Sequence, residues 1–188
     1  MPQYISSFHS HFHLASPVAP GYPRKTQSVL EGTIMFHKRG EPYYEFSTSY
    51  PAPITIKGKT YASCENYVLA QKYAGTALEE RIRKCNDAQS AQVLCRQSTA
   101  SSRYNWEVVR VTAMEQALYA KFTQHEDLRQ LLLSTEPRNI VFHIMSDEYW
   151  GDGQDGGGQN QLGKILMQLR SELWPNDLQF TQMHSHVW

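Results

Sequence analysis

Apolar residues at helical spacing mark the second half of the chain. After residue 160, apolar side chains fall at positions i, i+3, i+4, i+7 and i+11, which predicts an amphipathic helix limited by Pro175. These side chains are Leu162, Ile165, Leu166, Leu169 and Leu173. A longer helix is predicted after an Asn105 cap, with an apolar stripe at Val111, Met114, Leu118 and Phe122. Between them, "HEDLRQLLLS" predicts one more helix, which ends before Pro137.

The first half combines shorter helices with a hairpin. Residues 53–61, "PITIKGKTY", alternate β-formers with polar residues around a glycine, a pattern typical of a short hairpin. Ser63 then caps a helix that stops near Gly75, and further helices are expected at 77–84 and 88–96. The remaining strand candidate is "NIVFHIM", from Asn139 to Met145. The pattern therefore predicts an α+β, helix-rich fold with a few short strands.

The two ends of the chain differ from its middle. Residues 1–31 show no helical or strand period and contain four prolines, so we interpret them as an extended or disordered N-terminal arm. Residues 32–175 hold every predicted element, and we expect them to form a single compact domain. Residues 176–188 are expected to be a C-terminal tail.

Charge and composition narrow the possible partners and location. The chain has 18 Lys and Arg against 18 Asp and Glu, a formal net charge of 0, so any anion must be held locally and not by a general field. Three cysteines without a C-x-x-C pair fit free thiols in a reducing compartment. No apolar run reaches the roughly 18 residues of a membrane span. We therefore expect an intracellular, cytoplasmic protein with no membrane partner.

A glycine-rich segment, "YWGDGQDGGGQN" at residues 149–160, lies between the last strand candidate and the last helix. Such a loop before a helix offers backbone N–H groups and the positive end of the helix dipole, which together form an anion cradle. Tyr149 and Trp150 suit the flat face of a sugar or base. The alternative is a solvated surface loop. A dinucleotide fingerprint is not expected, because the helix opens only near Asn160 and little chain follows it.

Glu65 is a candidate acid or base. It lies in the first turn of its predicted helix, where the helix dipole favours a carboxylate. Helical spacing puts it on one face with Val68, Leu69 and Lys72, so its side chain does not point to a plainly solvated side. A half-buried carboxylate near a cation can transfer protons. Alternatively, the charge of Glu65 only stabilises the positive N-terminus of the helix. The residue spacing does not decide between these two roles.

Other polar and aromatic clusters are weaker candidates. Trp106 is expected in the core or, with Arg103 and Tyr104 nearby, beside a stacked phosphate-bearing ligand. The histidine tracts "HSHFH" (9–13) and "HSH" (184–186) place imidazoles on one side of an extended segment. A metal site needs further ligands and rigid support for them. No metal or cofactor is therefore expected.

Four stretches in the same order resemble the NADAR superfamily of YbiA-like N-glycosidases, over about residues 34–173. They are "FSTSYPAPITIKGKTYASCENYVLAQKY", "RYNWE", "AKFTQHEDLRQLLLST" and "DEYWGDGQDGGGQNQLGKILMQLR". The last is long and unusual enough to be a strong match. The resemblance implies hydrolysis of a ribosyl C1–N bond in substrates linked to NAD, ADP-ribose or nucleotide metabolism.

By position, the resemblance implies the site residues. The helix carboxylate is Glu65, expected as acid or base, and the stacking tryptophan is Trp106. Asp147 is expected as an electrostatic partner. Arg103, which the resemblance does not select, is expected to contact a second phosphate because of its place near Trp106. The remaining loop residues, expected to contact substrate, are Tyr149, Trp150, Gly151, Asp152 and Asn160.

The chain also departs from the family pattern. It reads Ser47-Thr48-Ser49 where the family usually has Ser-Asn-Phe, and Asn66 where the family has His. Tyr104 stands in place of a basic residue, and Phe142 in place of a frequent Glu. These positions bear on the choice of substrate between subfamilies.

Three functions follow as hypotheses. The one we favour is an N-glycosidase that removes ADP-ribose from ADP-ribosylated guanine, in a nucleoside or in modified DNA or RNA. The second is hydrolysis of riboflavin-pathway ribosylamino-pyrimidine phosphates. The third, of another class, is a non-hydrolytic ADP-ribose-binding module. In each case the partner is a ribosylated nucleotide, and no obligate protein partner is inferred.

Overall fold

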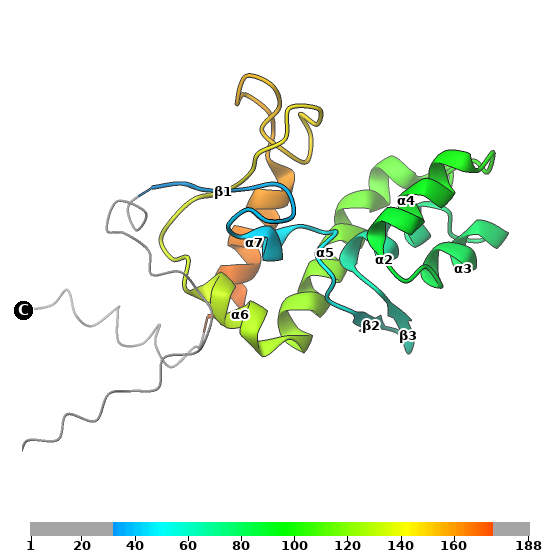
Figure 1. Cartoon of the computed structure of the whole chain (residues 1–188), viewed down its shortest axis with the longest axis horizontal. Coiled ribbons are helices and arrows are strands. Elements are labelled where there is room, and N and C mark those ends of the chain that lie inside the picture. The colour runs from blue at the N-terminus through cyan, green and yellow to red at the C-terminus, as the bar shows by residue number, and fades with distance from the viewer. Residues whose placement is uncertain (1–31, 175–188) are drawn as a thin grey trace, which may run out of the picture.

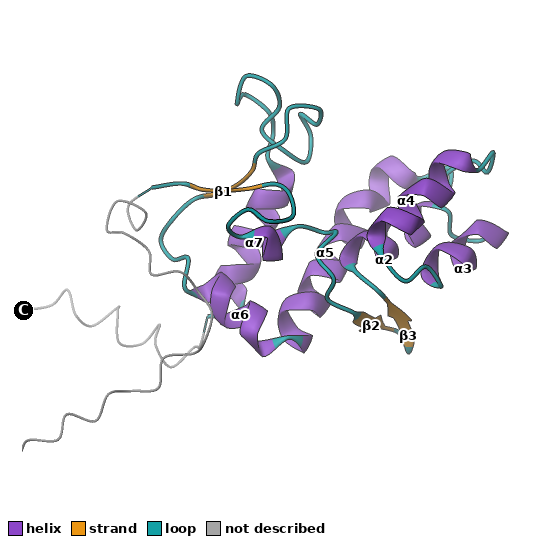
Figure 2. Cartoon of the chain, in the orientation of Figure 1, coloured by secondary structure: helices purple, strands orange, loops and turns teal. Residues whose placement is uncertain are grey.

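The computed structural model describes residues 32–174, which are mainly helical (Figure 1). In chain order the elements are β1 (Ile34–Phe36), the 3-10 helix η1 (Tyr44–Phe46), β2 (Ile54–Ile56), β3 (Lys59–Tyr61), α2 (Cys64–Lys72), α3 (Ala77–Arg83), α4 (Ala88–Gln97), α5 (Trp106–Gln124), α6 (Glu126–Leu133), β4 (Ile140–Phe142) and α7 (Gln161–Glu172). The predicted α+β, helix-rich class is confirmed (Figure 2). The predicted arm and tail lie outside the described residues.

Side-chain caps start the helices where the sequence predicts. Ser63 accepts a hydrogen bond from the backbone of Asn66 at the start of α2, and Asp87 caps α4 through the backbone of Ser90. Asn105 also stands before α5, but its side chain makes no cap hydrogen bond. It accepts from Arg103 Nε at 2.7 Å instead.

Two small sheets hold the strands. β2 and β3 form the predicted antiparallel hairpin, whose turn residues Lys57 and Gly58 both have positive φ, as a tight hairpin turn requires. β1 pairs in parallel with β4, so that Ile34 lies opposite Ile140. The sequence pattern did not predict β1, because three residues are too short for a period and the partner strand is far along the chain.

The strand predicted at residues 139–145 is shorter in the structure. His143 N still donates to Phe36 O at 3.0 Å, which continues the pairing with β1 for one bond beyond β4. The next amide, Ile144 N, donates instead to the Asp152 carboxylate at 3.1 Å. A side chain of the glycine-rich loop therefore ends the strand.

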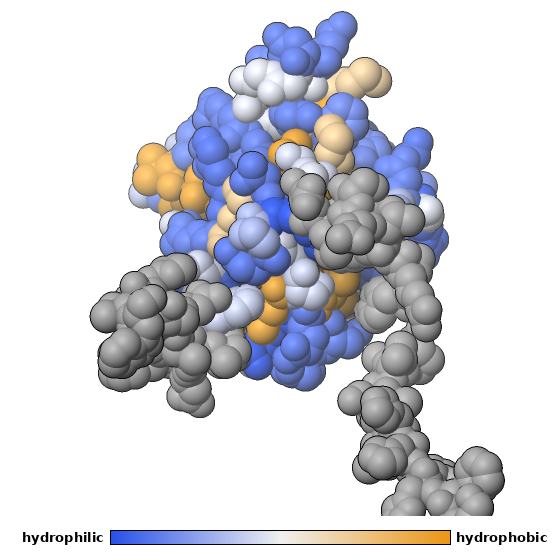
Figure 3. Space-filling view, turned by 90° about the vertical axis from the view of Figure 1, so that its left-hand side faces the viewer, coloured by the Kyte–Doolittle hydropathy of each residue, from blue (hydrophilic) through white to orange (hydrophobic). Residues whose placement is uncertain are grey.

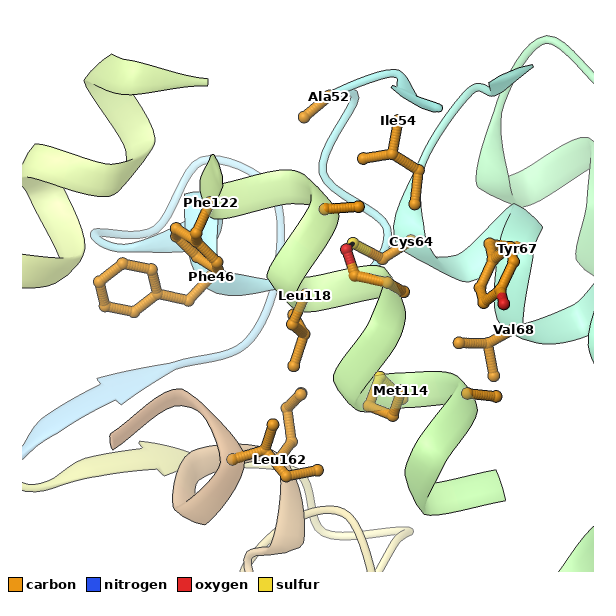
Figure 4. Close-up of a cluster of buried hydrophobic side chains, with 14 of the residues drawn as sticks. Phe46, Ala52, Ile54, Cys64, Tyr67, Val68, Met114, Leu118, Phe122 and Leu162 are labelled. Carbon is orange, nitrogen blue, oxygen red and sulfur yellow. Dashed lines mark hydrogen bonds between the residues drawn. The ribbon is translucent and has the colours of Figure 1, made fainter. Parts of the chain in front are cut away.

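The core is built around α5, which packs on α2, α6, α7 and β2. Figure 4 shows Phe46 and Phe122 facing each other beside Leu118 and, further along, Leu162 of α7. The rings of Phe46 and Phe122 lie 6.1 Å apart, edge to face. This packing fixes η1 to the C-terminal part of α5, and η1 leads directly into the segment that touches Glu65.

One face of the described part of the molecule is mainly hydrophilic where it can be seen. Figure 3 shows mainly hydrophilic side chains there, with apolar ones in small separate patches. Within residues 32–174, none of the helices has the length and apolar character needed to cross a membrane.

Candidate active site

Glu65 is held by two neutral donors from different elements. Its Oε2 accepts a hydrogen bond from Thr48 Oγ1 at 2.6 Å, and its Oε1 accepts from Gln92 Nε2 of α4 at 3.3 Å. Its backbone N–H also donates to Thr48 O at 2.9 Å. The carboxylate is half-buried. It is thus fixed in one orientation by hydrogen bonds, and across residues 32–174 no ion pair engages it.

Lys72, the cation expected on the same face of α2, is therefore not a direct partner of Glu65. Sequence reasoning identified Thr48 only as a departure from the family pattern, and it did not identify Gln92. Gln92 lies 27 positions from Glu65 along the chain, so no local spacing connects the two. Helix α4 carries it to the carboxylate.

A fully buried lysine supports the segment that ends in Thr48. Lys121 of α5 donates from Nζ to the carbonyl oxygens of Glu45 and Ser47, at 2.5 and 2.9 Å. Its ammonium also lies 5.2 Å from the ring centroid of Tyr50. Burial lowers the pKa of Lys121 to about 8. Because Thr48 follows Ser47, Lys121 positions the hydroxyl that donates to Glu65.

This buried lysine predicts a pH effect on stability. Between pH 8 and 9, the free energy of unfolding should rise by about 1 kcal/mol more in the wild type than in Lys121→Met. In the unfolded chain Lys121 stays protonated in this window, with a pKa near 10.5, whereas the folded protein loses that proton as the pH passes about 8. Unfolding then takes up a proton, so higher pH favours the folded state.

The pH range of this test ends at pH 9 because the Cys64 thiol begins to affect stability above that value. Burial raises the pKa of Cys64 to about 11, so above its ordinary value near 9 that thiol favours the folded state less as pH rises. Urea unfolding of both variants at pH 8 and 9 measures the difference. Equal pH dependence in the two proteins would contradict a buried ammonium at this position.

The glycine-rich loop folds on itself. The backbone N–H groups of residues 158–162 donate in turn to the carbonyl oxygens of Asp152, Glu148, Gly151, Tyr149 and Trp150, at 2.6–3.1 Å. The amides of residues 158–162, part of the expected anion cradle, therefore already have partners within the loop. Pairing between the two arms of the loop uses the donors that a phosphate would need.

Three loop side chains expected at the substrate also serve the loop. Asp147 Oδ1 accepts from the backbone of Tyr149 and Trp150, at 3.0 and 2.8 Å. The buried Asp152 bonds His143 Nδ1 at 2.8 Å through one oxygen and a backbone amide through the other. Asn160 bridges to β4, accepting from one backbone amide and donating to a carbonyl. These contacts give each side chain a structural task.

The two loop aromatics lie against α5. The guanidinium of Arg110 lies 3.6 Å from the ring centroid of Tyr149, and Glu107 holds that guanidinium at 2.9 Å. The ring of Trp150 meets Tyr149 edge to face at 5.0 Å. One face of Tyr149 is therefore covered by Arg110. Sequence reasoning did not identify Arg110, whose stacking partner lies in a distant loop.

Trp106 and Arg103 stand at the start of α5. Trp106 is half-buried against the core, and helical spacing puts it on the same face as Arg110, one turn further on. The backbone N–H of Arg103 donates to Lys72 O at 2.9 Å, which ties this segment to the end of α2. The structure thus gathers Trp106, Tyr149 and Trp150 around the first turns of α5.

An open groove of about 1140 Å³ reaches Gln92, the hydrogen-bond partner of Glu65, although Glu65 itself and the other predicted site residues do not line it. Gln92, which donates to Glu65, lines it, and so does Ser49, the neighbour of Thr48. His37 lines the same groove and stacks on Phe142 of β4 at 6.1 Å, so the groove extends towards the base of the loop. Among residues 32–174, no hydrogen bond or ion pair joins Glu65 directly to Asp147.

A second groove and the placement of metal-ligating side chains bear on the other expectations. A second groove, of about 560 Å³, lies between the hairpin, α5 and α7, and none of the predicted site residues lines it. Within residues 32–174, no group of three His, Cys, Asp or Glu side chains is placed to hold a metal ion. The histidine tracts at 9–13 and 184–186 lie outside the described residues.

A fixed carboxylate beside an open polar groove, in an α+β domain, is typical of an enzyme that acts on a small polar ligand. The NADAR domain model matches residues 35–174, and the chain belongs to this family. N-glycosidase YbiA of Escherichia coli is 40% identical over 155 residues, which cover 82% of this chain and 97% of that protein.

Two other comparisons extend this result. The NMR structure of the E. coli protein YbiA superposes with a TM-score of 0.68 and 36% identity, over 84% of this chain and 93% of that one. A riboflavin biosynthesis protein of Vibrio vulnificus is 36% identical over 146 residues, 78% of this chain but 40% of that protein. The relatives are therefore named for N-glycosidase activity and for riboflavin biosynthesis.

Proposed function

We propose that the chain is an N-glycosidase that hydrolyses a ribosyl C1–N bond. The observation that carries the proposal is the Glu65 carboxylate, held by Thr48 and Gln92 at the edge of a 1140 Å³ groove. The name of the E. coli relative, N-glycosidase YbiA, supports the reaction class. In this scheme the protein acts on a ribosylated nucleotide, and the groove receives it.

The chemistry assigns a clear task to Glu65. Breaking a ribosyl C–N bond builds positive charge at C1 and the ring oxygen, while water must approach C1 and the leaving nitrogen must gain a proton. A carboxylate in a fixed orientation can accept a proton from that water and stabilise the developing cation. Thr48 and Gln92 hold it so that it does not swing towards solvent.

The loop residues take supporting roles in the proposal. Tyr149 and Trp150 offer ring faces for a base or ribose, with Trp106 and Arg103 at the adjacent start of α5. Asp147 acts by shaping the turn that presents the two rings, and its negative charge adds to the field there. Gly151, Asp152 and Asn160 keep the loop folded, and we do not assign them direct contacts to phosphate.

We favour ADP-ribosylated guanine as the substrate. The groove is open and carries both cationic and polar side chains, which suits a long, phosphate-bearing ligand such as ADP-ribose. The departures at Thr48, Asn66 and Phe142 point away from the riboflavin-type members. The alternative is a ribosylamino-pyrimidine phosphate, which the name of the Vibrio vulnificus relative favours.

A two-substrate assay tests the proposal. Purified protein is offered ADP-ribosylated guanine in an oligonucleotide and, separately, a ribosylamino-pyrimidine phosphate, and the products are separated by chromatography. We expect free ADP-ribose from the first and no release from the second. The reverse result would assign the riboflavin-type reaction, and binding of ADP-ribose without turnover of either would indicate a non-hydrolytic binding module.

A further inference from the structure

We infer that the phosphate groups of the substrate bind at a basic rim of the groove, formed by Arg39 and Arg96, and not at the glycine-rich loop. Arg39 lies in the connection between β1 and η1, and Arg96 lies in the last turn of α4. Both line the groove that Gln92, the hydrogen-bond partner of Glu65, also lines. The inference rests on the proposed function, since it names the part of the same site that recognises the phosphates.

The loop leaves the phosphate without an obvious partner. Its amides from residues 158 to 162 donate to carbonyl oxygens of the loop itself. A phosphate therefore cannot use the start of α7 without breaking several backbone hydrogen bonds. A chain of formal net charge 0 must then hold the anion by local cations elsewhere.

The groove concentrates positive charge in a neutral protein. Its charged lining side chains are Lys38, Arg39 and Arg96 against Asp87. Asp87 is already engaged as the cap of α4, where it accepts hydrogen bonds from the amide and hydroxyl of Ser90 at 2.6 and 3.0 Å. The remaining field at the rim is therefore positive.

The two arginines are available to a ligand. Both side chains are exposed, and within residues 32–174 neither has a hydrogen bond or ion pair to another residue. Lys38 pairs with Glu41 at 3.5 Å, so it contributes less. A guanidinium presents a planar fork of donors that matches phosphate oxygens in pairs. Arg39 and Arg96 are thus suited to a phosphate ester or pyrophosphate.

The position of Arg96 relative to Glu65 fits a ribose phosphate. Gln92 and Arg96 are four residues apart on α4, so they share one helix face about one turn apart. Gln92 touches Glu65, which places Arg96 roughly one helical turn from the carboxylate. A ribose held with C1 at Glu65 would extend its 5′-phosphate in that direction.

His37 supports a ligand at the same wall. It lines the groove next to Lys38 and Arg39, and its Nδ1 is buried with no hydrogen-bond partner among the described residues. Because this nitrogen has almost no accessible surface, a ligand hydroxyl or phosphate in the groove would pair with it only after the ring turns. Stacking on Phe142 keeps the ring at this wall.

Charge-neutralising variants test the inference. With ADP-ribosylated guanine as substrate, Arg39→Gln and Arg96→Gln should each raise KM about tenfold, with kcat changed less than twofold. The matched control is Lys57→Gln, which removes one exposed cation at the β2–β3 turn, outside this groove. Its KM should equal that of the wild type. Melting temperatures of all three should agree, since the side chains are exposed.

The outcomes separate this inference from the proposed function. If the wild type turns over and neither arginine variant raises KM above the Lys57→Gln value, the rim is wrong while the reaction stands. If the wild type turns over no ribosyl substrate, calorimetric titration with ADP-ribose and with pyrophosphate decides. An affinity about tenfold lower in both arginine variants than in Lys57→Gln supports the basic rim. Equal affinities in the three variants overturn it, and so does the absence of any binding to the wild type.

Discussion

Replacing Glu65 with glutamine is expected to lower kcat by about 10²-fold or more, while the melting temperature stays close to that of the wild type. The loss is that of a positioned acid or base group. The amide keeps the shape of the carboxylate and can still accept from Thr48, and the Gln92 amide can turn to offer its oxygen to the new NH₂ group. The fold therefore loses little, and the reaction loses its charge.

A matched variant makes this result specific. Glu115→Gln removes an equivalent charge from α5 at the border of the second groove, where no predicted site residue lies. We expect its kcat to equal that of the wild type. Turnover in Glu65→Gln near the rate of Glu115→Gln would remove Glu65 from the mechanism. Initial rates at saturating substrate and thermal unfolding curves provide both readouts.

Local sequence signals located most of the fold. Cap residues such as Ser63 and Asp87 start their helices by bonding amides only three residues away, so the pattern needed for each is contiguous. The hairpin turn at Gly58 is equally local. β1 was missed because its strand partner is β4, which lies more than 100 positions further along the chain. Non-local pairing leaves no period in three residues.

In the candidate site, too, local features could be predicted from the sequence and long-range contacts could not. The helix face and the family resemblance both selected Glu65, but its donors Thr48 and Gln92 lie 17 and 27 positions away. Lys121, which supports the Thr48 segment, contacts carbonyl oxygens more than 70 positions away. Backbone carbonyls carry no side-chain signature, so a sequence does not reveal that a lysine will bind them. The packing of α5 against η1 determines that contact.

The glycine-rich loop was predicted to offer its amides to an anion, whereas the structure pairs the amides of residues 158–162 within the loop. A glycine run before a helix is compatible with a phosphate cradle, but it is also compatible with two loop arms that approach closely. The structure has the second arrangement, in which Gly158 N donates to Asp152 O at 2.7 Å. What decides between them is the pairing partner of each amide, which depends on the path of the loop.

A single methyl group at Gly151 is expected to disrupt this arrangement. In Gly151→Ala the new Cβ would overlap Ile144 Cγ2 and would lie 2.8 Å from Phe142 O and 3.0 Å from Asp147 O. Those two carbonyls accept hydrogen bonds that hold the loop, from Asp152 N and from Gly151 N itself. Relief requires movement of backbone, so we expect the free energy of unfolding to fall by about 3 kcal/mol, with loss of activity.

Gly157→Ala is the matched control, because it adds the same methyl group six residues further along the same loop. Its nearest neighbour would be Asp155 Oδ1 at 3.2 Å, the end of an exposed side chain that can move. The free energy of unfolding should change by less than about 0.5 kcal/mol. Urea unfolding of both variants distinguishes a self-paired loop from an open one. Equal, small effects would show that the loop arms separate freely, and the amides of residues 158–162 would again be candidates for binding phosphate.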